Sequence, residues 1–233
     1  FISYKKSDIH IKAREDLMNK WVNYFIDNYC ISRNNRIQLG ETIYDIRNQI
    51  VKVSDPILKK EIVIKNFKLE RAYDKIRFRF LPSKAERSLK LARALEKIGL
   101  NTPSPIAVIE KRGKTNELVF SYYITEYVDY DFNMLDIARD YDHPERDKIK
   151  ELMPQLGREV RKMHEGGVVH NDLHAGNILV KNYEQEPELY YIDLNRGRIK
   201  DDLMEKDKIN DLKLLKFTEE EKEIFFKNYS SDN

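Results

Sequence analysis

The sequence holds a single cysteine, Cys30, so the chain cannot form an internal disulfide bond. This is typical of proteins from a reducing compartment. Long apolar runs are absent too: none approaches the roughly 20 residues of a membrane-spanning helix, and the N-terminal residues lack a secretory pattern. Internal repeats and low-complexity linkers are also missing. From these absences we expect a soluble, cytoplasmic protein.

The composition fits one globular unit of two lobes, because the chain has 233 residues, of which 41% are hydrophobic and 35% charged. The net charge of +2 is unevenly distributed. Residues 59–97, here called the basic stretch, hold thirteen Lys and Arg residues against five acidic ones. Such a stretch attracts nucleotide phosphates, phosphorylated sugars or an anionic bilayer surface. The alternative is an ordinary solvated face.

The most informative part of the chain is residues 168–180, followed by the apolar run 189–194. Asp172 and Asn177 are five positions apart between two apolar segments, so one tight loop can turn both side chains toward one point. Asp193 ends the second apolar run, and a hairpin would bring it to the same place. Phosphoryl transfer needs a carboxylate that accepts the proton of the attacking hydroxyl, and oxygen ligands for magnesium. We assign the first role to Asp172 and the metal to Asn177 and Asp193.

The alternative for this motif is a polar loop that carries His, Asp and Asn by accident. The spacing of His170, Asp172 and Asn177 arises by chance in roughly one chain of this length in a hundred, given average residue frequencies. The apolar run that ends at Asp193 is further evidence against a chance occurrence of this spacing. The pattern therefore indicates the active site of a kinase.

The periodicity of apolar residues predicts the remaining elements. Ser83 is placed to cap a helix and Gly99 to end it. The expected elements are a helix over residues 12–30, strands over 36–39, 42–53 and 61–67, a helix over 83–98, strands over 106–110 and 118–127, and a helix over 149–163.

This order of elements predicts an α+β, two-lobed, protein-kinase-like fold that forms one catalytic domain. The N-terminal lobe, residues 1–127, would hold an outer helix, a small antiparallel sheet and one main helix. The C-terminal lobe, residues 128–233, would be mostly helical and carry the catalytic loop. We expect the chain to cross between the lobes at 125–130, with nucleotide bound in a cleft there.

At these positions the chain resembles the protein-kinase-like phosphotransferases, and most of all the lipopolysaccharide kinase family. That family phosphorylates Kdo or heptose in the inner core of Gram-negative lipopolysaccharide. The similarity covers about residues 61–215. It is carried by Val63-Ile64-Lys65, by residues 84–88 leading to the Gly-Leu-x-x-Pro-x-Pro turn at 99–105, by the loop 170–177, and by the Asp-x-x-Arg-Gly-Arg run at 193–198.

The resemblance implies ATP and Mg2+ as cofactors, together with roles for further residues. Lys65 would be the strand lysine that holds the nucleotide's phosphates, with a surface lysine on an edge strand as the alternative. Glu86 would be the helix glutamate that pairs with Lys65. Glu126 and Val128 would offer the backbone groups that read adenine. Two more residues would support the loop: His170 would brace the metal-binding segment, and Asp211 would cap loop N–H groups.

The chain also departs from the protein-kinase pattern. No glycine-rich loop precedes Lys65, so we expect a plain β-turn around Gly40 or Ser54-Asp55 to cover the phosphates. No glycine follows Asp193-Leu194, and no long activation loop is present. Only about forty residues follow Asp193, too few for a large peptide-binding lobe. A small-molecule or glycolipid acceptor is therefore expected.

Three functions remain in view. The first is a kinase of the lipopolysaccharide inner-core glycolipid, peripheral at the cytoplasmic face of the inner membrane, with ATP and an anionic membrane surface as partners and no nucleic acid. The second is a kinase of the same fold acting on another acceptor, such as an aminoglycoside or a protein. Aminoglycosides are cations, and the basic stretch disfavours them. The third is a nucleotide-binding pseudokinase that serves as a scaffold, which the complete set of four site residues disfavours.

Overall fold

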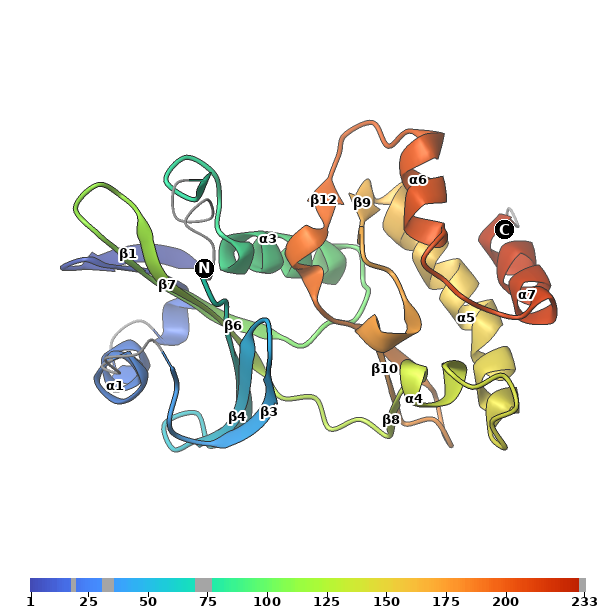
Figure 1. Cartoon of the computed structure of the whole chain (residues 1–233), viewed down its shortest axis with the longest axis horizontal. Helices are drawn as coiled ribbons and strands as arrows, with labels where there is room; N and C mark the ends of the chain where they lie inside the picture. Colours follow the sequence, from blue (N-terminus) through green and yellow to red (C-terminus); the bar gives the residue numbers. More distant parts are fainter. Residues whose placement is uncertain (18–19, 31–35, 70–76, 231–233) are drawn as a thin grey trace. The chain divides into compact units, whose positions relative to one another are not determined.

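The computed structural model describes residues 1–17, 20–30, 36–69 and 77–230 (Figure 1). The chain divides into two compact units. The first comprises Phe1–Leu89 and Ser104–Tyr127, and the second Lys90–Pro103 and Val128–Asn233. The expected lobe boundary between residues 127 and 128 coincides with one of the points at which the chain passes between units. The assignment of all of residues 1–127 to one lobe stays a prediction.

The first unit is built on a seven-stranded sheet in the order β1-β2-β6-β7-β5-β4-β3 (Figure 1). Every neighbouring pair is antiparallel. Strand β4 alternates between buried and more exposed residues, the pattern of a sheet with one face on the core. The strands are β1 (Ile2–Lys6), β2 (Ile9–Ala13), β3 (Glu41–Asp45), β4 (Gln49–Asp55), β5 (Lys60–Asn66), β6 (Pro105–Arg112) and β7 (Leu118–Glu126).

Helix α1 (Lys20–Tyr29) contributes its aromatic side to the core of this sheet. It follows a short 3-10 turn, η1 (Glu15–Leu17). Trp21 is 1% exposed, and its indole N–H donates to Asp55 Oδ2 at 2.7 Å. Asp55 Oδ1 accepts from the backbone N–H of Ile57 and Leu58 in the turn after β4. One buried carboxylate thus joins the helix to a hairpin turn.

Three of the expected element boundaries in this unit are wrong. The helix expected over 12–30 begins only at Lys20, because residues 9–13 alternate in burial and pair as strand β2. Residues 36–39 form no strand, and the Gln49 side chain bonds both backbone groups of Ile37 instead. The expected strand 42–53 is a hairpin whose turn lies at residues 46–48.

Helix α3 (Lys84–Lys97) begins and ends where the sequence indicates. The Ser83 hydroxyl accepts from the Glu86 N–H at 3.0 Å, and Glu86 Oε2 accepts from the Ser83 N–H at 3.4 Å. This reciprocal pair is a capping box. Gly99 follows the helix with a φ of +66°, a conformation that favours glycine. The first part of α3 belongs to the first unit and the part from Lys90 to the second.

The second unit is mostly helical. Helix α7 lies along α5 (Figure 1). At this contact a Cβ on Gly157 would meet the Phe225 carbonyl oxygen at 2.5 Å. The Arg146 guanidinium also binds both carboxylate oxygens of the buried Glu221, each at 2.6 Å. Among the residues that the structure describes, no helix is both long and apolar enough to span a bilayer. The helices are α4 (Met134–Ala138), α5 (Arg146–Glu165), α6 (Glu205–Leu212) and α7 (Glu219–Ser230).

Two small sheets complete this unit. One has the order β11-β10-β8, and the other pairs β12 with β9. The segment after α3 attaches to the first, because the Thr102 hydroxyl donates to the Tyr191 carbonyl at 2.8 Å. Their strands are β8 (Phe132–Asn133), β9 (Val168–Val169), β10 (Ile178–Lys181), β11 (Glu188–Tyr191) and β12 (Arg198–Ile199).

Candidate active site

The hairpin of β10 and β11 brings the two expected metal-binding residues to neighbouring positions. Ile178 pairs with Tyr191 across this hairpin. One residue beyond, the Ile192 N–H donates to the Asn177 carbonyl at 3.0 Å. Asp193 follows directly, so the backbone of Asn177 is bonded to the residue just before Asp193. The hairpin inferred from the sequence is therefore present.

Asn177 is oriented by the backbone of Asp172. Its Nδ2 donates to the Asp172 carbonyl at 2.8 Å. Asn177 is 6% exposed, so this bond fixes a buried amide. With the nitrogen committed, Oδ1 is the amide atom left to accept a bond or bind a cation.

The Asp172 carboxylate has a partner that the sequence did not predict. Arg196 Nη1 donates to Asp172 Oδ1 at 3.0 Å. The Asp172 side chain is 17% exposed, and that of Arg196 is 57% exposed. The carboxylate is thus largely sheltered, whereas the guanidinium is open to solvent.

Two residues of the site have a left-handed backbone. Asn171 has a φ of 58°, and Asp193 has φ 58° and ψ 46°. Asn and Asp tolerate this region better than most residues, although it still costs energy. Such conformations persist where surrounding bonds over-determine them, which is common at active sites. Here they lie just before Asp172 and at Asp193 itself, where the short 3-10 turn η3 (Leu194–Arg196) begins.

A fully buried carboxylate holds the start of the loop. Asp211, on α6, accepts from the N–H groups of His170 and Asn171, each at 2.7 Å. Its Oδ2 also lies 3.3 Å from Nε2 of the buried His164. These contacts are of the capping kind that the resemblance implies for Asp211. The role of His164 was not recognised from the sequence.

His170 lies beneath the loop rather than in reach of solvent. Its Nε2 donates to the Ile192 carbonyl at 2.9 Å, next to Asp193. Burial lowers the pKa of His170 below its ordinary value, which outweighs the raising effect of Asp211. A neutral ring that ties the loop to the Asp193 segment fits a bracing role.

His174, for which the sequence indicated no role, ends the same loop. Its Nδ1 accepts from the Gly176 N–H at 3.0 Å, which caps the 3-10 turn η2 (Ala175–Asn177). Its Nε2 lies 3.2 Å from Asn177 Nδ2. The only available signal was the placement of a histidine three residues before Asn177, which does not by itself distinguish a cap from a ligand.

The donor atoms present fit magnesium better than a soft metal. Asn177 Oδ1 and the Asp193 carboxylate are the hard oxygen donors that Mg2+ prefers. Within the described residues no group of three or more His, Cys, Asp or Glu side chains could hold a metal ion. Asn177 and Asp193 would thus hold Mg2+ only together with nucleotide phosphates and water.

Lys65 lies on β5, an interior strand between β7 and β4. The alternative of an edge-strand lysine is therefore wrong. Lys65 is half-buried, between Ile50 and Tyr123 in register, and its Nζ lies 5.3 Å from the centre of the Phe67 ring. Attraction between the Lys65 ammonium group and the face of the Phe67 ring thus helps to hold the ammonium group in place.

Glu86 has contacts other than the one expected. Its Oε1 forms a short ion pair with Lys12 of β2, and its Oε2 caps α3 through Ser83. The bond to Ser83 gives Glu86 a role in capping α3. Its pairing with Lys65 stays a prediction, without support from the contacts of Glu86.

The two residues expected at the adenine end lie at the end of β7 and just after it. Glu126 ends β7; its carboxylate binds Lys60 at 2.9 Å and Arg14 at 3.4 Å, and its N–H donates to the Ser104 carbonyl. Val128 is the first residue of the following segment of the second unit. Their roles toward adenine stay predictions.

The turns expected to cover the phosphates differ in their distance from Lys65 along the sheet. Ser54 pairs with Glu61, at the opposite end of β5 from Lys65, and Gly40 packs against Lys52 and Val53. The turn at residues 46–48 is closer, because Gln49 and Ile50 pair with Asn66 and Lys65. Since the chain rises about 3.3 Å per residue in a strand, Ser54-Asp55 lies farther from Lys65 than this turn does, and which turn covers the phosphates stays a prediction.

Lys68 ties down that turn. Its Nζ donates to the Ile46 carbonyl at 2.9 Å and lies 2.8 Å from Asp45 Oδ1. The turn at 46–48 is thus held by a residue just after β5.

Comparison with known proteins identifies the family of the chain. A 3-deoxy-D-manno-octulosonic acid kinase of Haemophilus influenzae is 31% identical over 144 residues, which cover 60% of this chain and 58% of the relative. The chain therefore matches somewhat more than half the length of that protein. Cyclin-dependent kinase 12 of Caenorhabditis elegans is 28% identical over 168 residues, 70% of this chain but 21% of that protein.

Among solved structures, WaaP in complex with acyl carrier protein superposes with a TM-score of 0.67 and 17% identity, over 94% of this chain and 88% of that one. This likeness confirms the expected α+β kinase-like fold. The sequence model of the lipopolysaccharide kinase (Kdo/WaaP) family matches residues 60–231, which bear the candidate site. The chain thus belongs to the lipopolysaccharide kinase (Kdo/WaaP) family.

Proposed function

We propose that this chain is an ATP- and Mg2+-dependent kinase that phosphorylates a hydroxyl of Kdo or heptose in the lipopolysaccharide inner core. One observation carries the proposal: Asp172, Asn177 and Asp193 come together on a single short loop and hairpin. The Asn177 side chain donates to the Asp172 carbonyl, and the Asn177 carbonyl accepts from Ile192, the residue just before Asp193. A carboxylate beside two oxygen donors for a hard cation is the equipment that phosphoryl transfer requires.

Asp172 would act as the catalytic base. The acceptor oxygen forms a bond to the γ-phosphorus of ATP, the bond from that phosphorus to ADP breaks, and the hydroxyl proton passes to Asp172. Bound Mg2+ neutralises charge on the phosphates. Asn177 and Asp193 would hold that ion, while His170, His174 and the buried carboxylate of α6 keep the loop in shape.

The nucleotide would be bound chiefly by residues of the first unit. Lys65 presents an ammonium group from an interior strand, which suits the phosphates of ATP. The turn at residues 46–48 is the best candidate to cover those phosphates, because it lies next to Lys65 in register. Backbone groups of Glu126 and Val128 would read adenine.

The choice of acceptor rests on the family and on the relatives. The Haemophilus influenzae relatives are named as kinases of 3-deoxy-D-manno-octulosonic acid, a sugar that carries a carboxylate. The basic stretch would aid capture of such an anionic glycolipid. We place the enzyme at the cytoplasmic face of the inner membrane, where it would bind peripherally through these charges.

A second candidate is a kinase of the same fold that acts on a protein or another small molecule. The similarity to a cyclin-dependent kinase covers 70% of this chain, and it supports kinase chemistry but not a protein as the acceptor. A pseudokinase scaffold is a third reading, and the intact set of Lys65, Asp172, Asn177 and Asp193 is evidence against it.

The test is an acceptor panel. Purified protein is incubated with ATP and Mg2+, and each of four acceptors: a Kdo-bearing inner core, a heptose-bearing inner core, an aminoglycoside and a generic protein. ADP release and phosphate gain of the acceptor are both measured. Turnover with an inner-core sugar alone supports the proposal. Turnover with only the aminoglycoside or the protein supports the second candidate, and ATP binding without turnover supports the scaffold.

The first prediction is that Asp172→Asn removes most turnover, because it deletes the proton acceptor while preserving shape. A positioned general base contributes about a hundredfold to ten-thousandfold. Nucleotide binding and the melting temperature should stay close to those of the parent protein. Asp136→Asn is the matched control, since Asp136 is also an aspartate paired with an arginine, Arg139, but on the surface of α4. Turnover by the Asp172 variant at near the parent rate would remove Asp172 from the mechanism.

A further inference from the structure

The ion pair between Asp172 and Arg196 has a consequence for substrate choice. Arg196 Nη1 donates to Asp172 Oδ1 at 3.0 Å, so one oxygen of the proposed base already accepts a charged hydrogen bond. The same guanidinium is more than half exposed, with 57% of the side chain accessible. The proposed base must accept a proton from the acceptor hydroxyl, yet Arg196 already binds one of its carboxylate oxygens.

The backbone of Arg196 is held in place on several sides. Its carbonyl accepts from Asn171 Nδ2 at 3.3 Å and from Arg198 Nη1 at 2.9 Å. Gly197, the next residue, packs so closely on Leu91 that a Cβ there would overlap the Leu91 side chain. The Arg196 side chain thus extends toward Asp172 from a backbone that several contacts hold in place.

The chemistry of arginine indicates what else this side chain can bind. A guanidinium presents five N–H donors in a planar fork that matches a carboxylate or phosphate in a bidentate arrangement. Only one of the two terminal nitrogens is engaged with Asp172 in the contact described. Any acceptor whose hydroxyl reaches Asp172 must also come within reach of this exposed fork.

We propose that Arg196 is a specificity-determining residue that binds the carboxylate of the acceptor sugar and, in doing so, leaves Asp172. The exchange of one carboxylate for another frees the Asp172 oxygen to accept the hydroxyl proton. A neutral sugar offers Arg196 no such partner, so the ion pair stays and the base remains occupied. The inference rests on the proposed function, because it takes Asp172 as the base and a sugar acid as the acceptor.

The test compares a Kdo-bearing acceptor with the same acceptor converted to its carboxamide. In the parent enzyme the carboxylate should be preferred by about ten- to hundredfold in kcat/KM, the range of a charge-assisted hydrogen bond. Arg196→Gln should reduce this preference to within about threefold, chiefly by slowing the carboxylate substrate, while KM for ATP stays unchanged. Arg196→Lys should restore part of the preference, because it keeps the charge but not the fork.

Arg139→Gln is the matched control, since Arg139 is an exposed arginine paired with Asp136 of α4 rather than with Asp172. It should leave the preference intact. Equal loss on both acceptors in Arg196→Gln would overturn the inference and make Arg196 only a positioning residue for Asp172. An unchanged preference would reduce the contact to a solvated ion pair. If the parent enzyme phosphorylates a heptose-bearing inner core but neither Kdo acceptor, the inference alone is overturned. If it phosphorylates none of the three, with ATP still bound, the proposed function is overturned as well.

Discussion

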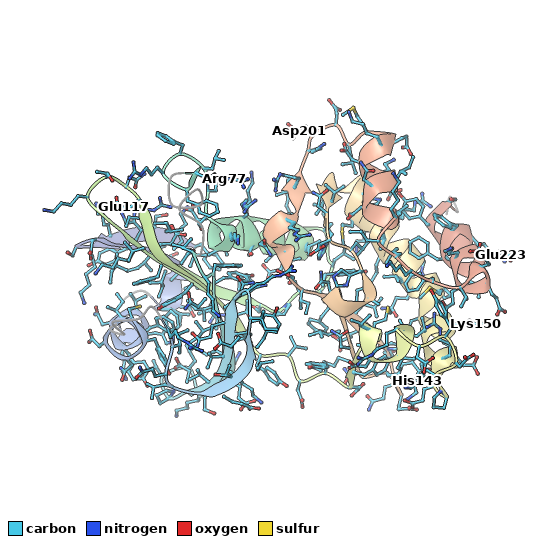
Figure 2. All side chains as sticks on the ribbon, in the orientation of Figure 1. Arg77, Glu117, His143, Lys150, Asp201 and Glu223 are labelled. Carbon is cyan, nitrogen blue, oxygen red and sulfur yellow. The ribbon has the colours of Figure 1, made fainter. Side chains whose placement is uncertain are left out.

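Asp193 and Asn177 are neighbours in space, but they differ in the charge that they offer a cation. We predict that Asp193→Ala weakens magnesium-supported ATP binding more than Asn177→Ala does, because a carboxylate supplies a full charge and an amide only a dipole. Titration of nucleotide with and without magnesium checks this. Asp201→Ala is the control, since Asp201 is an exposed acid of the same unit (Figure 2). Equal magnesium dependence in the parent protein and the Asp193 variant would contradict the prediction.

Buried His170 should make stability depend on pH. Its folded-state pKa is lowered by burial, whereas the unfolded side chain titrates near 6.5. Below about pH 6.5 the unfolded state therefore binds more protons, so the stabilisation is present above that pH and is lost as the pH falls toward the folded-state pKa. We predict that His170→Gln, which keeps a donor but cannot titrate, has a smaller drop in melting temperature between pH 7.5 and 5.5 than the parent protein.

His143→Gln is the control for this experiment, because His143 lies in a partly exposed turn before α5 (Figure 2). It should leave the pH dependence as it is. If His170→Gln shows the full parental drop, another group must be responsible.

At the residue scale, spacing was enough to predict that Asp172, Asn177 and Asp193 come together on one loop and hairpin. It could not identify Arg196 as the partner of Asp172, since 24 residues separate them and only the folded hairpin joins them. Glu86 is a different case. Its position near the start of α3 has a purely local explanation, the capping box with Ser83, which competes with the pairing inferred from the family.

The contact between α5 and α7 depends on a glycine. Alanine would favour the helix by about 1 kcal/mol over glycine in an open position. At Gly157, however, the added Cβ would meet the Phe225 carbonyl at 2.5 Å and the Tyr229 nitrogen at 3.2 Å. We predict that Gly157→Ala lowers the free energy of unfolding by about 1–3 kcal/mol, the range of an overpacked core. Urea denaturation followed by circular dichroism measures this.

Arg158→Ala, on the next residue of α5 but exposed, serves as the comparison and should change stability by only about 0.5 kcal/mol or less. A Gly157→Ala protein more stable than the parent would mean that α7 shifts to make room, with helix propensity deciding the outcome.

At the element scale, prediction succeeded where one face of an element is buried. Helix α5 buries Leu152, Leu156 and Val160 on a single side, which produces a clear helical period. Strand β1 is exposed at all five of its residues, so no apolar alternation marks it, and it was missed. The apolar spacing of Trp21 and Phe25 predicted helix α1. Residues 12 and 13 were wrongly assigned to that helix, because the two-residue period of strand β2 was not distinguished from a helical period.

The charge of the basic stretch is partly neutralised in the folded protein. Lys60 pairs with Glu126, and Lys68 with Asp45. Arg77 lies with its guanidinium 5.9 Å from the Phe78 ring, on the first unit (Figure 2). Arg77 and Arg79 are two of the remaining basic residues of the stretch, and Arg71 and Lys75 fall outside the described residues.

We predict that replacing Arg71, Lys75, Arg77 and Arg79 together by Gln raises KM for the glycolipid and leaves KM for ATP unchanged. Each charge contributes about 1 kcal/mol of attraction to an anionic membrane surface. The difference from the parent should shrink as salt rises, because ions screen charges beyond about 8 Å at physiological ionic strength. Steady-state kinetics and liposome sedimentation at low and high salt check both parts.

A second quadruple variant carries the same charge change on the second unit, through Gln at Lys206, Lys208, Lys213 and Lys216. It should retain liposome binding. If both variants lose binding equally, net charge matters and the basic stretch has no special role; if neither does, the stretch is only a solvated face.

The interleaving of the two units could not be read from the sequence, because α3 is a single uninterrupted helical pattern that serves both. Its consequence concerns synthesis on the ribosome. Leu91 and Leu95 are buried in the finished protein, and Leu91 packs against Gly197, about a hundred residues later in the chain. At about 5–20 residues per second, Leu91 waits roughly 5–20 s for that partner. During this interval the second half of α3 presents an apolar stripe to solvent, and it is the segment of the nascent chain where a chaperone would be most useful.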